Sequence, residues 1–124
     1  MFVIVHNVTR KKDLGHQVRQ AKSLVSRTVG LLLTPTLDSG EGLWIKPCKS
    51  VHTFFMRYPI DVLFMDADHR VVAIQTLTPW KISRWVSRSW SVLEVPAGTA
   101  QATHTVVDDQ LTFVEMPVSS EKVN

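Results

Sequence analysis

The chain has 124 residues, of which 44% are hydrophobic and 20% charged, and its formal net charge is +3. These values are typical of one globular domain that buries its own core. The small charge excludes strong phosphate-driven binding, so the sequence carries no strong nucleic-acid signal. The single cysteine excludes an internal disulfide. No window approaches the roughly 18 apolar residues of a transmembrane segment, and we expect a cytoplasmic protein without a cofactor.

The first half of the chain predicts short strands and one helix. The helix is expected at 23–33, where leucines recur at helical spacing before Pro35 ends it. A charged segment ending in Gly15 predicts a turn over residues 10–15. Strands are expected where Val, Ile and aromatic residues gather, at 2–9, 16–22, 42–46 and 51–56.

The second half begins with the clearest local pattern, a β-hairpin. Residues Ile60–Met65 and Arg70–Leu77 are two strand-like runs that a four-residue turn separates. Residues 78–91 have no regular period and are expected to form a loop. A strand at 91–95, a short helix at 97–104, a strand at 111–115 and a frayed polar tail at 118–124 complete the prediction.

This order of elements predicts a single α+β domain over residues 1–124. We expect a compact, mainly antiparallel β barrel with one or two short helices. A partly closed barrel protects the edges of many short strands from pairing with other chains.

Three motifs in the same order indicate a family. They are RTVGLL at 27–32, the run from GLWI at 42–45 through PC and HTFFM to IDVLF at 60–64, and VLEVPAGT at 92–99. The chain resembles the domain of unknown function 192 family, also called uncharacterised protein family 0127. The likeness covers residues 22–114 and implies a small, mainly β barrel with no settled activity.

Two positions depart from the pattern of that family. Asp108 stands where members usually have Gly before the last strand, at a turn that Gly makes with positive φ. His52 stands where many members have Trp, so a function that needs this imidazole does not extend to the whole family.

A set of polar residues interrupts the apolar stretch 42–66, and we interpret it as the lining of a pocket. His52 and Arg57 are the expected polar anchors, beside Thr53 and Asp61, with Trp80 and Trp85 of the following loop as stacking walls. The hypothesis is a non-catalytic binding module for a small molecule or a protein segment. The structural alternative is an ion pair between Arg57 and Asp61 that holds the corner at Tyr58-Pro59.

Two other functions remain open from the sequence. The first is a hydrolase that uses His52 with Cys48 or Asp61, although a strand would hold Cys48 and His52 about 13 Å apart. The second is a weak nucleic-acid or membrane-surface binder through residues 80–90, where tryptophans alternate with basic residues. Cys48 and His52 lack the further ligands that zinc requires, so no metal is expected.

Overall fold

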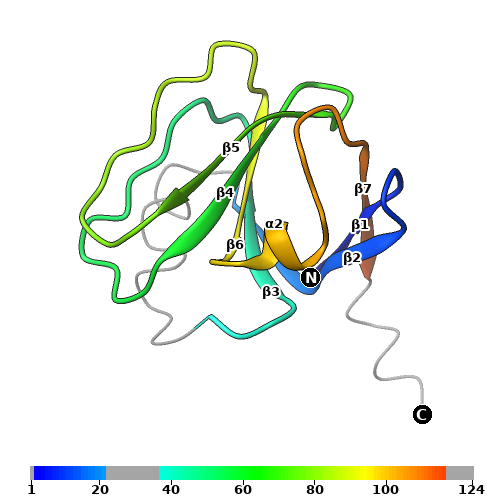
Figure 1. Cartoon of the computed structure of the whole chain (residues 1–124), viewed down its shortest axis with the longest axis horizontal. Coiled ribbons are helices and arrows are strands. Elements are labelled where there is room, and N and C mark those ends of the chain that lie inside the picture. Colours follow the sequence, from blue (N-terminus) through cyan, green and yellow to red (C-terminus); the bar gives the residue numbers. More distant parts are fainter. Residues whose placement is uncertain (1, 22–36, 117–124) are drawn as a thin grey trace.

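The computed structural model describes residues 2–21 and 37–116. Within these ranges seven strands form one sheet, and a one-turn helix precedes the last strand (Figure 1). The elements are β1 (Phe2–Asn7), β2 (Lys12–Ala21), β3 (Glu41–Ile45), β4 (Ile60–Met65), β5 (Val71–Leu77), β6 (Ser91–Pro96), α2 (Thr99–Ala102) and β7 (Leu111–Met116).

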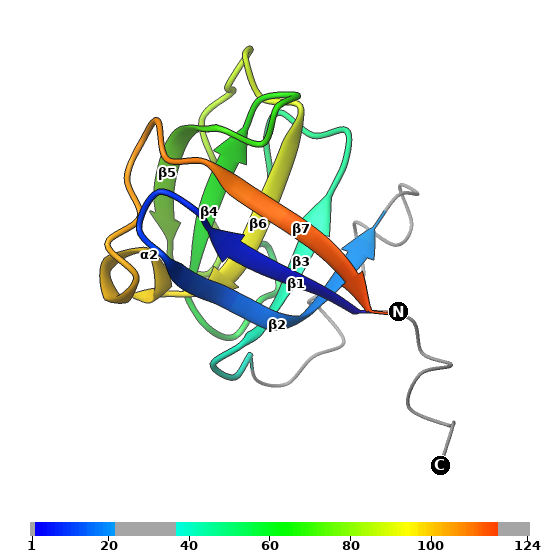
Figure 2. The same ribbon diagram turned by 90° about the vertical axis from the view of Figure 1, so that its right-hand side faces the viewer.

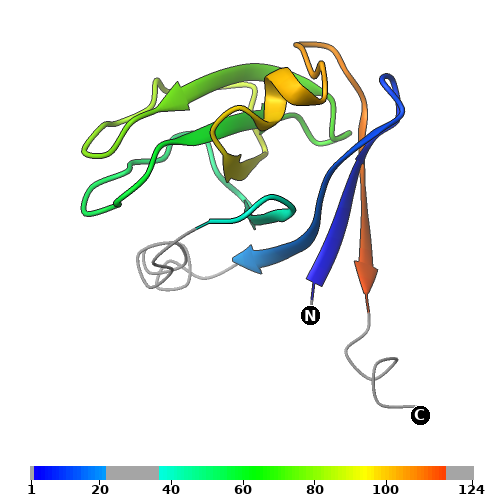
Figure 3. The same ribbon diagram turned by 60° about the horizontal axis from the view of Figure 1, so that its bottom comes forward.

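The strand order is β5-β4-β6-β3-β2-β1-β7, and every neighbouring pair is antiparallel except β2 with β3. Figures 2 and 3 show that the sheet curls, so that β1, β2 and β7 cross over β4 and β6. The predominantly β, mainly antiparallel fold that the sequence predicts is therefore confirmed.

The predicted barrel is not confirmed, because the sheet does not close. The two end strands approach each other at one corner, where Arg70 and Gln110 form an isolated bridge. There the Val71 N–H donates to the Asp109 carbonyl over 2.9 Å. Along their lengths, however, β5 pairs with β4 and β7 pairs with β1, so the contact between the ends stays at this corner.

Alternation along the strands gives the sheet two apolar faces. One face carries Ile60, Val62 and Val92, and the other carries Val18 and Leu93. Buried residues of the segments between strands, Cys48, Met56 and Val86, pack on the first face.

The predicted hairpin is confirmed, with β4 and β5 paired from Ile60↔Leu77 to Met65↔Val71. Asp66 forms its turn, because the carboxylate accepts the backbone N–H of Asp68 and of Arg70 at 2.9 and 3.0 Å.

The strand predicted at 51–56 is wrong. His52 alone forms a bridge, to Ile82, and the chain then turns, with the Met56 N–H donating to the Thr53 carbonyl. The turn predicted at 10–15 is shorter than expected, because β2 already begins at Lys12. The helix predicted at 97–104 is reduced to the single turn Thr99–Ala102. The helix at 23–33 and the tail at 118–124 lie outside the described residues.

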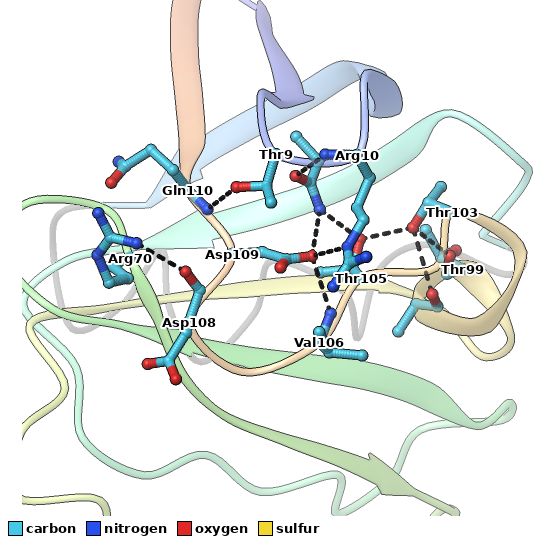
Figure 4. A network of polar contacts seen from close by, with 12 residues as sticks. Thr9, Arg10, Arg70, Thr99, Thr103, Thr105, Val106, Asp108, Asp109 and Gln110 are labelled. Carbon is cyan, nitrogen blue, oxygen red and sulfur yellow. Dashed lines mark hydrogen bonds and ion pairs between the residues drawn. The ribbon is translucent and has the colours of Figure 1, made fainter.

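A buried polar network joins the β1–β2 turn to the segment before β7 (Figure 4). Asp109 accepts hydrogen bonds from the side chains of Asn7 and Arg10, each at 3.0 Å, and from the Val106 N–H. Burial alone would raise the pKa of Asp109, but these hydrogen bonds outweigh it and hold the pKa below its ordinary value. The neighbouring Asp108 has φ 80°, the left-handed conformation that glycine adopts at no steric cost.

Candidate functional site

The site is built from two segments, residues 48–59 and 78–90, which we call the double loop. They run side by side, and their tips project from the end of the molecule away from β7 (Figures 1 and 3). Backbone hydrogen bonds of 2.8 to 3.0 Å connect them along their length, from Cys48–Trp90 and Lys49–Val86 to Val51–Ser83 and Thr53–Lys81. The double loop is therefore one braced unit, although neither segment contains a strand.

Thr53 joins the two segments at the centre of the double loop and is completely buried. Its hydroxyl donates to the Thr78 carbonyl at 2.7 Å and accepts the Lys81 N–H at 2.9 Å. Its own N–H and carbonyl bond Lys81 and Trp80. The hydroxyl thus serves the fold, and a ligand has no access to it.

Phe55 and Trp80 lie in contact at the tip, one from each segment. Their ring centroids are 4.5 Å apart, and the two side chains are 69% and 57% exposed. Both residues have positive φ, 68° and 67°. A bulky side chain in this region strains the backbone, and such strain occurs mainly at binding and catalytic sites. The fold therefore presents two aromatic rings to solvent in a conformation that neither residue favours.

Other hydrophobic side chains extend the exposed surface of the double loop. Ile82 is 64% exposed and Trp85 71%, and Phe54 stacks on His52 with ring centroids 4.9 Å apart. The opposite side of the double loop is also apolar, because Met56 and Val86 pack on the sheet. One apolar side thus packs on the core, and the other is exposed.

The charge of the double loop is entirely positive. It contains no Asp or Glu and five exposed basic residues: Lys49, Arg57, Lys81, Arg84 and Arg88. The remainder of the chain has nine basic and eleven acidic residues, a formal charge of −2. The net charge of +3 is therefore the sum of +5 on the double loop and −2 on the remainder of the chain.

Asp61, a predicted ligand contact, lies at the start of β4 and is 2% exposed. Its carboxylate accepts the Thr76 hydroxyl at 2.7 Å and the N–H groups of Gly98 and Ala100 at 3.1 and 3.0 Å. The last two bonds hold the chain at the start of α2. Arg57 is exposed and forms no ion pair with Asp61, so the pair considered from the sequence is absent.

His52 and Cys48 occupy different environments. His52 is exposed, and its Nδ1 accepts the Phe54 N–H at 3.2 Å. Cys48 is buried, and its thiol donates to the Ser50 carbonyl at 3.2 Å. Each of these two bonds stays within residues 48–59, and neither joins His52 to Cys48.

Glu94 is a buried ionisable residue that sequence reasoning missed. It is 5% exposed on β6, and its cross-strand partners are Leu43 and Val62. Burial raises the pKa of this carboxyl to about 8, and no residue in the described ranges gives it a hydrogen bond. Burial and the nearby Glu94 also raise the pKa of Tyr58. The only sequence signal was a Glu in the middle of the apolar run VLEVP.

A cavity of about 190 Å³ lies between the β1–β2 region, Gly40 and α2, and none of the six predicted site residues lines it. Among the residues that the structure covers, no three His, Cys, Asp or Glu side chains are placed to share a metal ion. In the same residues, no helix has the length and hydropathy needed to cross a bilayer.

The fold and the double loop define a small, curled β-sheet domain with an exposed aromatic and basic tip. The chain belongs to the domain of unknown function 192 family, described as an uncharacterized ACR, whose model matches residues 5–113. A UPF0127 protein of Pyrococcus horikoshii is 32% identical over 113 residues, which cover 87% of this chain and 96% of the relative. The corresponding protein of Pyrococcus furiosus is 31% identical over 113 residues, 89% and 97% of the two chains.

Two solved structures share the fold. A protein of unknown function from Novosphingobium aromaticivorans has a TM-score of 0.73 at 20% identity, covering 89% of this chain and 82% of its own. A putative transcription regulator from Sinorhizobium meliloti has a TM-score of 0.75 at 23% identity, covering 90% and 91%. At these identities the likeness concerns the fold alone.

Proposed function

We propose that the chain is a non-catalytic binding module whose contact surface is the outer side of the double loop. The observation that carries the proposal is the contact between Phe55 and Trp80. Two large rings are exposed, touch each other and sit on strained backbone. Strain and exposed hydrophobic area both cost stability, so a function other than folding explains their presence best.

The six residues expected from the sequence divide into two roles in this proposal. Trp80 and Trp85 are contact residues on the exposed surface, and His52 and Arg57 are the polar groups beside them. Thr53 and Asp61 position the surface, because their polar atoms are bonded inside the fold. The module then binds through a protruding tip and not through an enclosed pocket.

The test is binding of the whole chain to three defined probes: vesicles that contain an anionic phospholipid, a single-stranded oligonucleotide and a neutral oligosaccharide. The test variant is Phe55→Ser/Trp80→Ser. The matched control is Val106→Ser/Val107→Ser, which removes two other hydrophobic side chains, each 47% exposed and remote in sequence. Thermal unfolding establishes that both variants are folded.

We expect at least one probe to bind the unmodified chain and the control equally well, and the test variant at least tenfold more weakly. If the test variant binds as the control does, or if none of the three probes binds, the double loop is not a binding surface of this kind.

A further inference from the structure

We infer that the partner of the double loop is the anionic surface of a phospholipid bilayer, an inference that rests on the proposed function. Three independent features of the double loop support this partner: its charge, the kind of hydrophobic side chains that it exposes, and the pairing of its backbone.

The charge of the double loop complements an anionic surface. The double loop carries five exposed cations and no carboxylate in either segment. Arg57 lies two residues after Phe55, and Lys81 follows Trp80 directly. A surface that bears many phosphate groups attracts such a cluster, because each basic residue near an anionic membrane adds to the binding free energy.

The exposed hydrophobic side chains favour a bilayer over a nucleic acid or a sugar. Trp and Phe rings stack on bases and sugars, but the branched Ile82, 64% exposed, has no flat face to stack. Trp and Phe beside Ile are instead suited to the boundary between headgroups and acyl chains, where tryptophan is enriched. Ile82 also pairs with His52, so it belongs to the same part of the double loop as Phe54.

Backbone N–H groups at and beside Trp80 are already paired, which suits them to a medium of low polarity. The N–H groups of Thr53, Trp80 and Lys81 are already bonded across the double loop. Unpaired backbone groups are costly wherever water is excluded. The side chains of the tip can therefore enter the interface while the backbone keeps its hydrogen bonds.

The experiment is co-sedimentation of the whole chain with phosphatidylcholine vesicles, with or without about a third of phosphatidylglycerol. Ile82→Ser tests the hydrophobic contact, with Val107→Ser as control. Lys81→Gln/Arg84→Gln tests the charge, with Lys11→Gln/Lys12→Gln as control, because all four of these basic side chains are exposed. The same proteins are titrated with a single-stranded oligonucleotide.

We expect at least tenfold tighter binding to the anionic vesicles than to pure phosphatidylcholine, and a severalfold loss for each test variant but for neither control. Binding to the oligonucleotide without binding to vesicles would overturn this inference and leave the proposed function intact. Equal binding to both kinds of vesicle, or anionic binding that Ile82→Ser leaves unchanged, would also overturn it. Binding to no probe would remove the proposed function as well.

Discussion

Phe55 and Trp80 hold their rings 4.5 Å apart at the tip of the double loop, and each does so with a left-handed backbone. Each ring is more than half exposed, so the contact between them buries little area. The arrangement costs conformational energy without a matching gain in the core. This imbalance is the main reason to assign the tip to binding. The strain can be measured as a change in the free energy of unfolding when a strained residue is replaced.

Replacing Trp80 by glycine should leave the free energy of unfolding unchanged or raise it by up to about 1.5 kcal/mol. A left-handed conformation costs an ordinary residue about 1–2 kcal/mol, and glycine is free of this cost but loses about 0.5–1 kcal/mol through its flexible unfolded chain. Urea unfolding measures the difference. Trp85→Gly is the control, because Trp85 is also more than half exposed but lacks a positive φ; it should lose stability. A larger loss for Trp80→Gly than for Trp85→Gly would contradict the account of strain.

Replacing Thr53 by valine should lower the free energy of unfolding by about 1–3 kcal/mol. The substitution keeps the shape of the side chain but removes the hydroxyl, which leaves the Thr78 carbonyl and the Lys81 N–H without this partner. Chemical denaturation compares it with Thr112→Val, the same change at an exposed position of β7. Equal stability of the two variants would show that the hydroxyl does not hold the double loop together.

The Asp61→Ala substitution should lower the free energy of unfolding by about 1–3 kcal/mol, because it leaves the N–H groups of Gly98 and Ala100 unpaired near α2. Binding by the folded variant should stay unchanged, since the carboxylate faces the fold. Asp68→Ala, in the exposed turn between β4 and β5, is the control. A stable Asp61→Ala variant that loses binding would place Asp61 in the contact surface instead.

Glu94 should make the free energy of unfolding fall as pH rises from about 4.5 to about 8. Burial holds the pKa of the folded carboxyl at about 8, so between these values the folded chain keeps a proton that the unfolded chain has released. Within this window, each pH unit lowers the free energy of unfolding by up to about 1.4 kcal/mol. Below the window Glu94 is protonated in both the folded and the unfolded chain, so it no longer makes stability depend on pH.

Glu94→Gln should remove this slope and stabilise the protein at pH 8 relative to the unmodified chain, whereas Glu115→Gln, at an exposed position, should do neither. Urea unfolding at four pH values between 4 and 9 measures the slope. A slope that Glu94→Gln leaves in place must originate from another group.

The parts of the fold that the sequence predicts are those set by neighbouring residues. The strand-like run Ile60–Met65 and the turn chemistry of Asp66 are local, and the hairpin follows from them. Asp108 was singled out as a non-glycine residue at a turn, and its φ of 80° shows the strain expected of that position.

The sequence predicted that residues of the two segments share a site, but the bonds that join the segments were missed because they connect distant residues. Thr53 pairs with Lys81 and Val51 with Ser83, and no local pattern announces these contacts. The aromatic run at 54–55 suggested a strand, but these rings belong to an exposed cluster and not to a sheet. Burial of Glu94 likewise depends on Leu43 and Val62, which come from two other strands.

The most direct test of the double loop as the contact surface is amide hydrogen exchange of the whole chain with and without saturating anionic vesicles. The account predicts slower exchange at residues 52–57 and 79–85, with exchange in α2 and β7 unchanged. Protection that appears at α2 or β7 while the double loop exchanges as before would contradict it.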